Sequence, residues 1–185
     1  MFMKNLIAHI LGTKEKRKIT ILFLGLSNAG KTTLLNYLIK QEFTEQTQVT
    51  MGANIQNFKT KVFNYNCVDL AGQKTFRVLW DNHIAYASAI IFVIDSVNFV
   101  DLDEAKNELQ HLSDLLIEKN LEPALLILAN KYDLQEALDF SKLKELIQLE
   151  SKQFKKANIF NVSIKTGLNV NDAFQWLEHE LLNTI

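Results

Sequence analysis

Apolar residues along the chain follow two alternating patterns: short apolar or alternating runs typical of strands, and longer segments with the periodicity of helices. The strand-like runs lie at residues 19–25, 55–69, 89–95, 124–129 and 159–162. The helix-period segments lie at residues 31–40, 75–86, 102–119, 140–154 and 170–182. This alternation predicts an α/β domain with a largely parallel sheet. A turn near residues 61–66 divides the second strand-like run into an antiparallel edge hairpin, so we expect six strands flanked by helices.

Two segments interrupt this alternation. Residues 41–51 are polar and aperiodic, which predicts a loop. Residues 12–18 separate an apolar amino-terminal segment from the first predicted strand. We therefore expect an amino-terminal arm at residues 1–18 and one domain over residues 19–185.

Composition narrows the class of protein. The 185 residues are 48% hydrophobic and 22% charged, with a formal net charge of −1, which favours one globular domain and gives no reason to expect a nucleic-acid partner. No apolar run is long enough to span a membrane. Cys67 is the only cysteine, so neither an internal disulfide nor a thiolate metal site is expected. We expect a cytoplasmic protein and a monomer.

A phosphate-binding motif follows the first predicted strand. Residues 25–32 are GLSNAGKT, which matches G-x-x-x-x-G-K-[ST] between a strand and a helix. Backbone N–H groups of such a loop face the phosphates, while Lys31 reaches the β- and γ-phosphates and Thr32 supplies an oxygen to Mg²⁺. The alternative is a chance glycine-rich turn. The nucleotide-binding residues expected here are Gly25, Ser27, Asn28, Ala29, Gly30, Lys31, Thr32 and Thr33.

A second motif, Asn130-Lys131-Tyr132-Asp133, follows the predicted strand 124–129 and indicates which base is bound. The Asp133 carboxylate can accept two hydrogen bonds from the guanine N1–H and 2-amino group, which adenine does not offer. Lys131 can lie against the base and Asn130 can tie the loop together. The alternative is an Asn/Asp-rich helix entry. Further base contacts are expected, more weakly, after the last strand, at Ser163, Ile164 and Lys165.

Residues 69–73, Asp-Leu-Ala-Gly-Gln, end another predicted strand and supply groups for phosphoryl transfer to water. Asp69 can hold Mg²⁺ through a water, and the Gly72 N–H can meet the γ-phosphate. Gln73 can orient the attacking water. Thr50, in the polar loop, is the expected second hydroxyl ligand for Mg²⁺. We expect catalytic roles for Gln73, Lys31 and Thr50.

With these motifs the chain resembles the Ras-like small GTPases, and most closely their Arf and Arf-like branch. The branch-specific likeness lies in residues 25–34, in Thr-Met-Gly-Ala-Asn at 50–54, in Arg-Val-Leu-Trp at 77–80, and in the 19 positions between Thr50 and Asp69. The sequence departs from the branch pattern at Val49, Ala53, Val68 and Ala71. The resemblance implies the P-loop small-GTPase fold, GTP/GDP and Mg²⁺ as ligands, an exchange factor, a GTPase-activating protein and effector proteins.

We therefore expect a GDP/GTP-regulated switch. The chain has two arginines, Arg17 and Arg77, and neither lies in the loop 41–49, so intrinsic hydrolysis should be slow and a partner should accelerate it. Arg77 is expected to form a surface ion pair rather than to act in catalysis. An alternative is a GTP-binding interaction module that hardly hydrolyses GTP. A kinase is disfavoured, because Asp133 favours guanine and no second substrate segment is present.

The amino-terminal arm has the pattern of an amphipathic helix. One side carries the apolar residues Phe2, Met3, Leu6, Ile7, Ile10 and Leu11. Lys14, Lys16, Arg17 and Lys18 follow, which predicts reversible contact of residues 2–11 with an anionic membrane surface. The alternative is a helix that packs on the domain. Residue 2 is not glycine and no cysteine lies near the carboxyl end, so no lipid anchor is expected.

Overall fold

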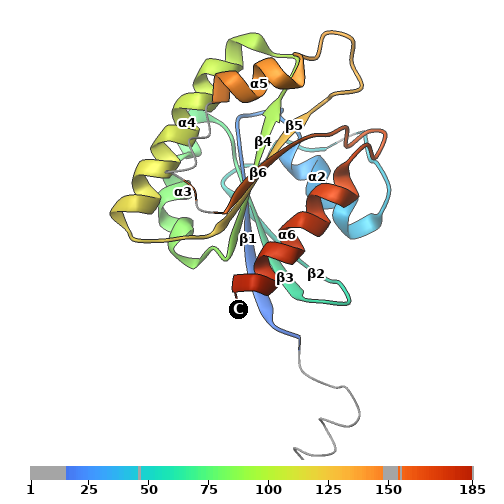
Figure 1. The fold of residues 1–185 in the computed structure, drawn as a ribbon. Helices are drawn as coiled ribbons and strands as arrows, with labels where there is room; N and C mark the ends of the chain where they lie inside the picture. Colours follow the sequence, from blue (N-terminus) through green and yellow to red (C-terminus); the bar gives the residue numbers. More distant parts are fainter. Residues whose placement is uncertain (1–15, 46, 148–153, 155, 185) are drawn as a thin grey trace, which may run out of the picture.

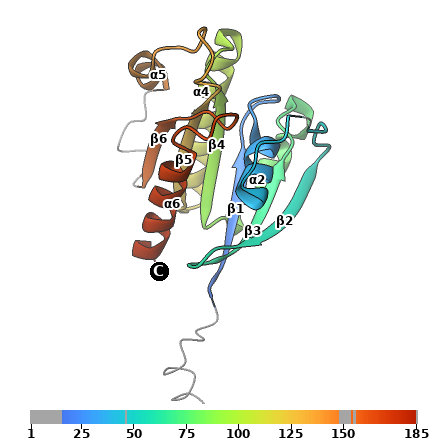
Figure 2. The ribbon, with the colours of Figure 1, turned by 90° about the vertical axis from the view of Figure 1, so that its right-hand side faces the viewer.

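The core of the molecule is one six-stranded sheet with the strand order β2-β3-β1-β4-β5-β6. The computed structural model describes residues 16–45, 47–147, 154 and 156–184. All neighbouring strands are parallel except β2 and β3, which form the predicted antiparallel hairpin at one edge (Figure 2). The strands are β1 (Lys18–Leu24), β2 (Ala53–Lys59), β3 (Asn64–Leu70), β4 (Ala89–Asp95), β5 (Ala124–Asn130) and β6 (Ala157–Asn161).

Helices cover both faces of the sheet (Figure 1). On one face lie α2 (Lys31–Lys40) and α6 (Val170–Thr184). On the other lie α3 (Val78–His83), α4 (Phe99–Glu118) and α5 (Phe140–Ile147). The α/β fold class is thus confirmed. No helix in the described part of the chain has the length and apolar character that a membrane span requires.

The alternation of side chains along each strand explains the two-sided core. On β1, Ile21 and Phe23 belong to the apolar cluster under α2 and α6, whereas Leu22 and Leu24 belong to the cluster under α3, α4 and α5. Every residue of β5 is buried, as expected for a central parallel strand with helices on both faces.

The segment 75–86 is helical, as predicted, but it is not one continuous helix. The segment divides into a 3₁₀ turn η1 (Lys74–Phe76), the short helix α3, and a second 3₁₀ turn η2 (Ile84–Tyr86). The Phe76 and Arg77 N–H groups bond three residues back, to Gln73 and Lys74. Such bonds make a tighter turn than an α-helix, and this turn brings the Arg77 side chain back to the Gly72 backbone.

The other predicted helices differ from the structure at their ends. α4 begins at Phe99, three residues before the prediction, and α6 continues to Thr184. Helix α5 is described as far as Ile147; most of the remainder of the predicted segment 140–154 lies outside the described residues. The predicted arm helix at residues 2–11 also lies outside them.

Candidate nucleotide and magnesium site

The phosphate-binding loop joins β1 to α2, as the sequence predicts. Gly25 has φ 131°, and a Cβ there would lie 2.1 Å from the Val93 carbonyl oxygen, so this position admits only glycine. The Lys31 side chain is buried and folds back over the loop, where its Nζ donates to the Leu26 carbonyl oxygen at 2.7 Å. Burial lowers the pKa of Lys31 to about 8, although the nearby Asp69 opposes this shift.

A cavity of about 150 Å³ opens beside this loop. It is bounded on one side by the phosphate-binding loop and on the other by the polar loop before β2 and by the segment after β3. Its lining residues are Ser27, Asn28, Gly30, Lys31, Thr32, Thr33, Thr47, Gln48, Val49, Thr50, Gly72 and Gln73. The structure therefore brings the predicted phosphate-binding residues other than Gly25 and Ala29 to one cavity with Thr50 and Gln73.

Three oxygen-bearing side chains from distant parts of the chain meet next to this cavity. The Thr32 hydroxyl donates to Asp69 Oδ2 at 2.6 Å, and the Thr50 hydroxyl lies 3.2 Å from the same oxygen. The two hydroxyl oxygens are 2.9 Å apart. Asp69 Oδ1 is buried and has no hydrogen-bond partner within the described part of the chain. Burial raises the pKa of Asp69, and hydrogen bonds from Thr32 and a charge on Lys31 oppose that rise.

This cluster fits Mg²⁺, a hard cation that prefers oxygen ligands and keeps several waters. A buried carboxylate with an unpartnered oxygen is unfavourable unless a positive charge compensates it. Among the described residues no group of three or more His, Cys, Asp or Glu side chains forms another metal site.

A second cavity, of about 240 Å³, lies next to the first and ends at the motif 130–133. Asn130 is buried and joins two loops there: its Nδ2 donates to the Ala29 carbonyl at 2.9 Å, and its Oδ1 accepts from the Ile164 N–H at 3.2 Å. The predicted loop-tying role of Asn130 thus matches the geometry. The lining residues are Asn28, Gly30, Thr33, Phe43, Glu45, Thr47, Asn130, Lys131, Asp133, Leu134, Ile164 and Lys165.

Gly72 lies directly against the phosphate-binding loop. A Cβ on Gly72 would be 2.4 Å from the Leu26 carbonyl carbon and 2.5 Å from the Gly25 oxygen and the Ser27 nitrogen. The segment after β3 is therefore packed so closely on the loop that no side chain fits between them.

Comparison with known proteins decides the family. The model of the ADP-ribosylation factor family matches residues 3–181. The ADP-ribosylation factor-like protein alp41 of Schizosaccharomyces pombe is 37% identical over 167 residues, which are 90% of this chain and 88% of the relative. The chain belongs to the ADP-ribosylation factor family.

Two further comparisons support this membership. ADP-ribosylation factor-like protein 6 of Danio rerio is 36% identical over 172 residues, 92% of each chain. The solved structure of the Arl6 BBS3 small GTPase from Trypanosoma brucei, with the bound nucleotide analogue GppNp, matches with a TM-score of 0.78 and 26% identity, covering 90% of this chain and 98% of that one. This chain is accordingly a small GTP-binding switch and GTP hydrolase with Mg²⁺ as cofactor. Its partners are regulators and effectors of the general kinds found in this family.

Some predicted site residues of this ADP-ribosylation factor-family chain are placed differently from what the sequence suggests. Gly25, Ala29 and Ser163 are buried and line neither cavity. The Ser163 hydroxyl instead accepts from the Thr166 N–H. Ile164 is one of the residues expected to contact the base, and its N–H donates to Asn130 Oδ1. Lys165 does line the second cavity.

One charged pair at the site was not predicted from the sequence, and another is less exposed than predicted. Lys131 has φ 66° and its Nζ lies 2.6 Å from Asp95, which ends β4. The one sequence signal for this pair is that Asp95 and Lys131 each lie at the carboxyl end of a predicted central strand. Arg77 was expected in a surface ion pair, but its side chain is only 11% exposed between Glu104 and Glu108, because helix α4 covers it.

Proposed function

We propose that the two adjoining cavities bind the phosphates and the guanine base of GTP, and that the segment after β3 promotes hydrolysis of the γ-phosphate. The convergence of Thr32, Thr50 and Asp69 carries the proposal. These residues come from α2, the polar loop and β3. Both hydroxyls contact Asp69 Oδ2, and the other carboxylate oxygen, Oδ1, has no partner among the described residues. A purely structural cluster would leave that oxygen unexplained.

The proposed ligand contacts follow from the lining of the cavities. The backbone of residues 25–33 surrounds the phosphates and Lys31 contacts the β- and γ-phosphates. Thr32 and Thr50 bind Mg²⁺ directly, and Asp69 binds it through a water. Asn130 holds the base-binding loop, Lys131 and Lys165 lie against the base, and Asp133 accepts hydrogen bonds from it. Bound Mg²⁺ neutralises charge on the phosphate oxygens.

Hydrolysis in this arrangement depends on positioning more than on covalent chemistry. Gln73 lines the first cavity, where its side chain orients water towards the γ-phosphate, and the Gly72 N–H meets that phosphate. No arginine lies in the loop 41–49, and Arg77 is held by Glu104 and Glu108. Intrinsic hydrolysis is therefore slow, and an activating protein that supplies an arginine accelerates it about 10³–10⁵-fold.

Single-turnover hydrolysis of GTP by the Gln73→Leu variant tests this proposal. We expect binding of GTP to persist and hydrolysis to fall by about tenfold or more. Gln175→Leu, the same substitution at an exposed position on α6, is the matched control and should hydrolyse GTP like the wild-type chain. Equal hydrolysis by the Gln73→Leu variant and the control would contradict the role of Gln73. Failure of the wild-type chain to hydrolyse GTP, even with cell extract, would favour the alternative of a hydrolysis-poor interaction module.

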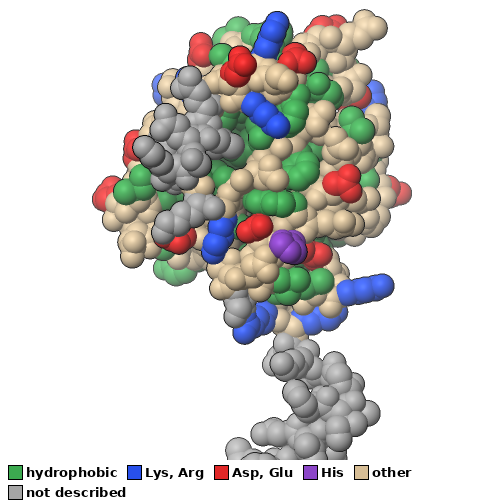
Figure 3. Space-filling model, in the orientation of Figure 1, with side chains coloured by type: hydrophobic (Ala, Val, Ile, Leu, Met, Phe, Trp, Pro, Cys, Tyr) green, Lys and Arg blue, Asp and Glu red, His purple; other side chains and the backbone are tan. Residues whose placement is uncertain are grey.

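We also propose that the chain contacts anionic membranes reversibly, through residues 2–11 and the basic residues that follow. Lys and Arg side chains gather at the end of the molecule where β1 begins (Figure 3). There Lys16, Arg17, Lys18 and Lys59 line one cavity of about 560 Å³. Basic side chains beside an apolar helix attract anionic lipid.

Flotation with anionic liposomes tests the membrane proposal, in the presence of GDP and of a non-hydrolysable GTP analogue. We expect stronger binding with the analogue and loss of binding in an Ile7→Asp, Ile10→Asp double variant, because charge disfavours insertion of the apolar side. Neutral liposomes are the control. Binding that is unchanged in the double variant would contradict a role for the arm. We further propose that the chain acts as a monomer, which light scattering during gel filtration tests.

A further inference from the structure

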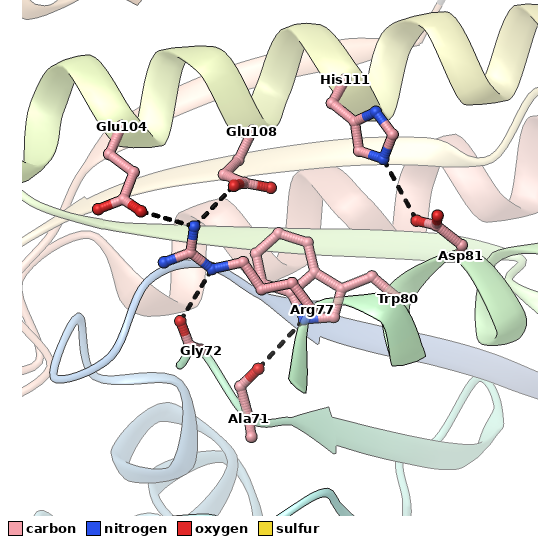
Figure 4. Close-up of polar contacts among 8 residues, drawn as sticks. All are labelled: Ala71, Gly72, Arg77, Trp80, Asp81, Glu104, Glu108 and His111. Carbon is pink, nitrogen blue, oxygen red and sulfur yellow. Dashed lines mark hydrogen bonds and ion pairs between the residues drawn. The ribbon is translucent and has the colours of Figure 1, made fainter. Parts of the chain in front are cut away.

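The two backbone carbonyls just before Gln73 are both held by side chains from the following segment (Figure 4). Trp80 Nε1 donates to the Ala71 oxygen at 3.2 Å. Arg77 Nε donates to the Gly72 oxygen at 3.0 Å. The carbonyls of both peptide units that include Gly72 atoms therefore have side-chain partners.

Fixing these carbonyls also fixes the N–H groups that follow them. A peptide unit is planar and trans, so its C=O and its N–H point in opposite directions. The Ala71 carbonyl belongs to the same peptide as the Gly72 N–H, and the Gly72 carbonyl belongs to the same peptide as the Gln73 N–H. Trp80 and Arg77 therefore determine where the Gly72 and Gln73 N–H groups point and where the Gln73 side chain starts.

Helix α4 in turn fixes the guanidinium of Arg77. Arg77 Nη1 lies 2.8 Å from Glu104 and 2.6 Å from Glu108, which are four residues apart on the same side of that helix. The guanidinium also lies over the Trp80 ring, 5.9 Å from its centroid. With a side chain only 11% exposed, Arg77 has little freedom to leave the Gly72 carbonyl.

We propose that Arg77, clamped by Glu104 and Glu108, is a positioning residue for GTP hydrolysis, which acts by holding the Gly72 carbonyl and so aligning Gly72 and Gln73 with the γ-phosphate. This inference rests on the proposed roles of Gly72 and Gln73. Arg77 lines neither of the two cavities proposed to bind GTP, and its Nε and Nη1 donate to one carbonyl and two carboxylates.

A second contact between α3 and α4 supplies a matched control. Asp81 Oδ1 lies 3.4 Å from His111 Nε2, one turn along the same two helices, and no hydrogen bond or ion pair joins Asp81 to Ala71 or Gly72 (Figure 4). Asp81→Asn alters this partly exposed contact between α3 and α4 without releasing either carbonyl. If Arg77 only attached α3 to α4, Asp81→Asn would cause the same defect in hydrolysis as Arg77→Lys.

The experiment compares Arg77→Lys, a Glu104→Gln, Glu108→Gln double variant, Asp81→Asn and Gln73→Leu with the wild-type full-length chain. Lysine keeps the charge of Arg77 but cannot hold a carbonyl and two carboxylates in a planar fork. Three quantities are measured: the single-turnover rate of GTP hydrolysis, the affinity for a non-hydrolysable GTP analogue, and the affinity for GDP.

We expect Arg77→Lys to lower hydrolysis about tenfold or more and to weaken binding of the analogue relative to GDP, because only the γ-phosphate uses Gly72 and Gln73. The glutamate double variant should show the same pattern to a smaller degree, and Asp81→Asn should behave like the wild type. The double variant decides the question if Arg77→Lys does not fold.

Other results overturn the inference. Wild-type hydrolysis in the Arg77→Lys and glutamate variants, together with a defect in Gln73→Leu, would refute the positioning role and leave the proposed function standing. Equal loss of affinity for GDP and for the analogue, or the same defect in Asp81→Asn, would assign Arg77 a purely structural role. Wild-type hydrolysis in Gln73→Leu would refute the proposed function and this inference with it.

Discussion

Adding one methyl group at Gly72 is a sharp test of how the segment after β3 meets the phosphate-binding loop. Gly72 does not have the left-handed φ found at Gly25 and Gly30, so alanine at this position introduces no backbone strain of that kind. Its Cβ would lie 2.4 Å from the Leu26 carbonyl carbon and 2.5 Å from the Gly25 oxygen. All the contacting atoms belong to backbone, so the segment itself has to move away.

The size of the effect follows from that displacement. Carbon atoms pack at about 3.5–4.0 Å, so Gly72→Ala must move the two segments apart by about 1 Å or more. A misplacement of about 1 Å costs about 10²-fold in rate when a reaction depends on positioning. We therefore expect single-turnover GTP hydrolysis to fall about 100-fold, which corresponds to about 2.7 kcal/mol of transition-state free energy. The affinity for GDP, which lacks the γ-phosphate, should change little.

The control is Gly52→Ala, which adds the same methyl group where no atom lies within 4 Å. Gly52 has φ 78°, so alanine there lowers stability by about 1–2 kcal/mol through backbone strain alone. We expect a lower melting temperature for this variant and hydrolysis close to that of the wild type. Hydrolysis at the wild-type rate by Gly72→Ala would refute the inference that close packing of Gly72 on the loop aligns the γ-phosphate.

Three further predictions concern the base, the hairpin and the lone thiol. Asp133→Asn should shift the preference from guanine to xanthine nucleotides, which competition binding measures; unchanged GDP affinity would refute the assignment of Asp133. Glu178 on α6 accepts from Thr60 Oγ1 and from the Tyr65 hydroxyl, each at 2.8 Å, so Glu178→Ala should lower the free energy of unfolding by about 1–3 kcal/mol, unlike Glu145→Ala at an exposed site. Burial raises the pKa of Cys67 to about 12, so alkylation followed by mass spectrometry should detect modification at pH 8 only in denaturant.

Local sequence by itself predicted the strands, most of the helices and the positions of the two motifs at the ends of β1 and β5. Each of these features depends on residues close together in the chain. Apolar residues at every second or every third to fourth position set the element type. Gly25 and Gly30 permit the positive φ values of the phosphate-binding loop. Because parallel strands end at the same edge of a sheet, the sequence also placed both motifs on one side of the molecule.

The motifs predicted that Thr32, Thr50 and Asp69 share one Mg²⁺ site, but only the tertiary structure gave the contacts between side chains from distant segments. The Thr32, Thr50 and Asp69 contacts join α2, the polar loop and β3, and no local pattern contains their distances. The low exposure of the Arg77 side chain likewise depends on helix α4, which lies more than twenty residues further along the chain. Periodicity describes the preference of one segment at a time. The contacts of Arg77 with Glu104 and Glu108 lie outside such a preference, because polar groups that the fold covers find partners wherever it places them.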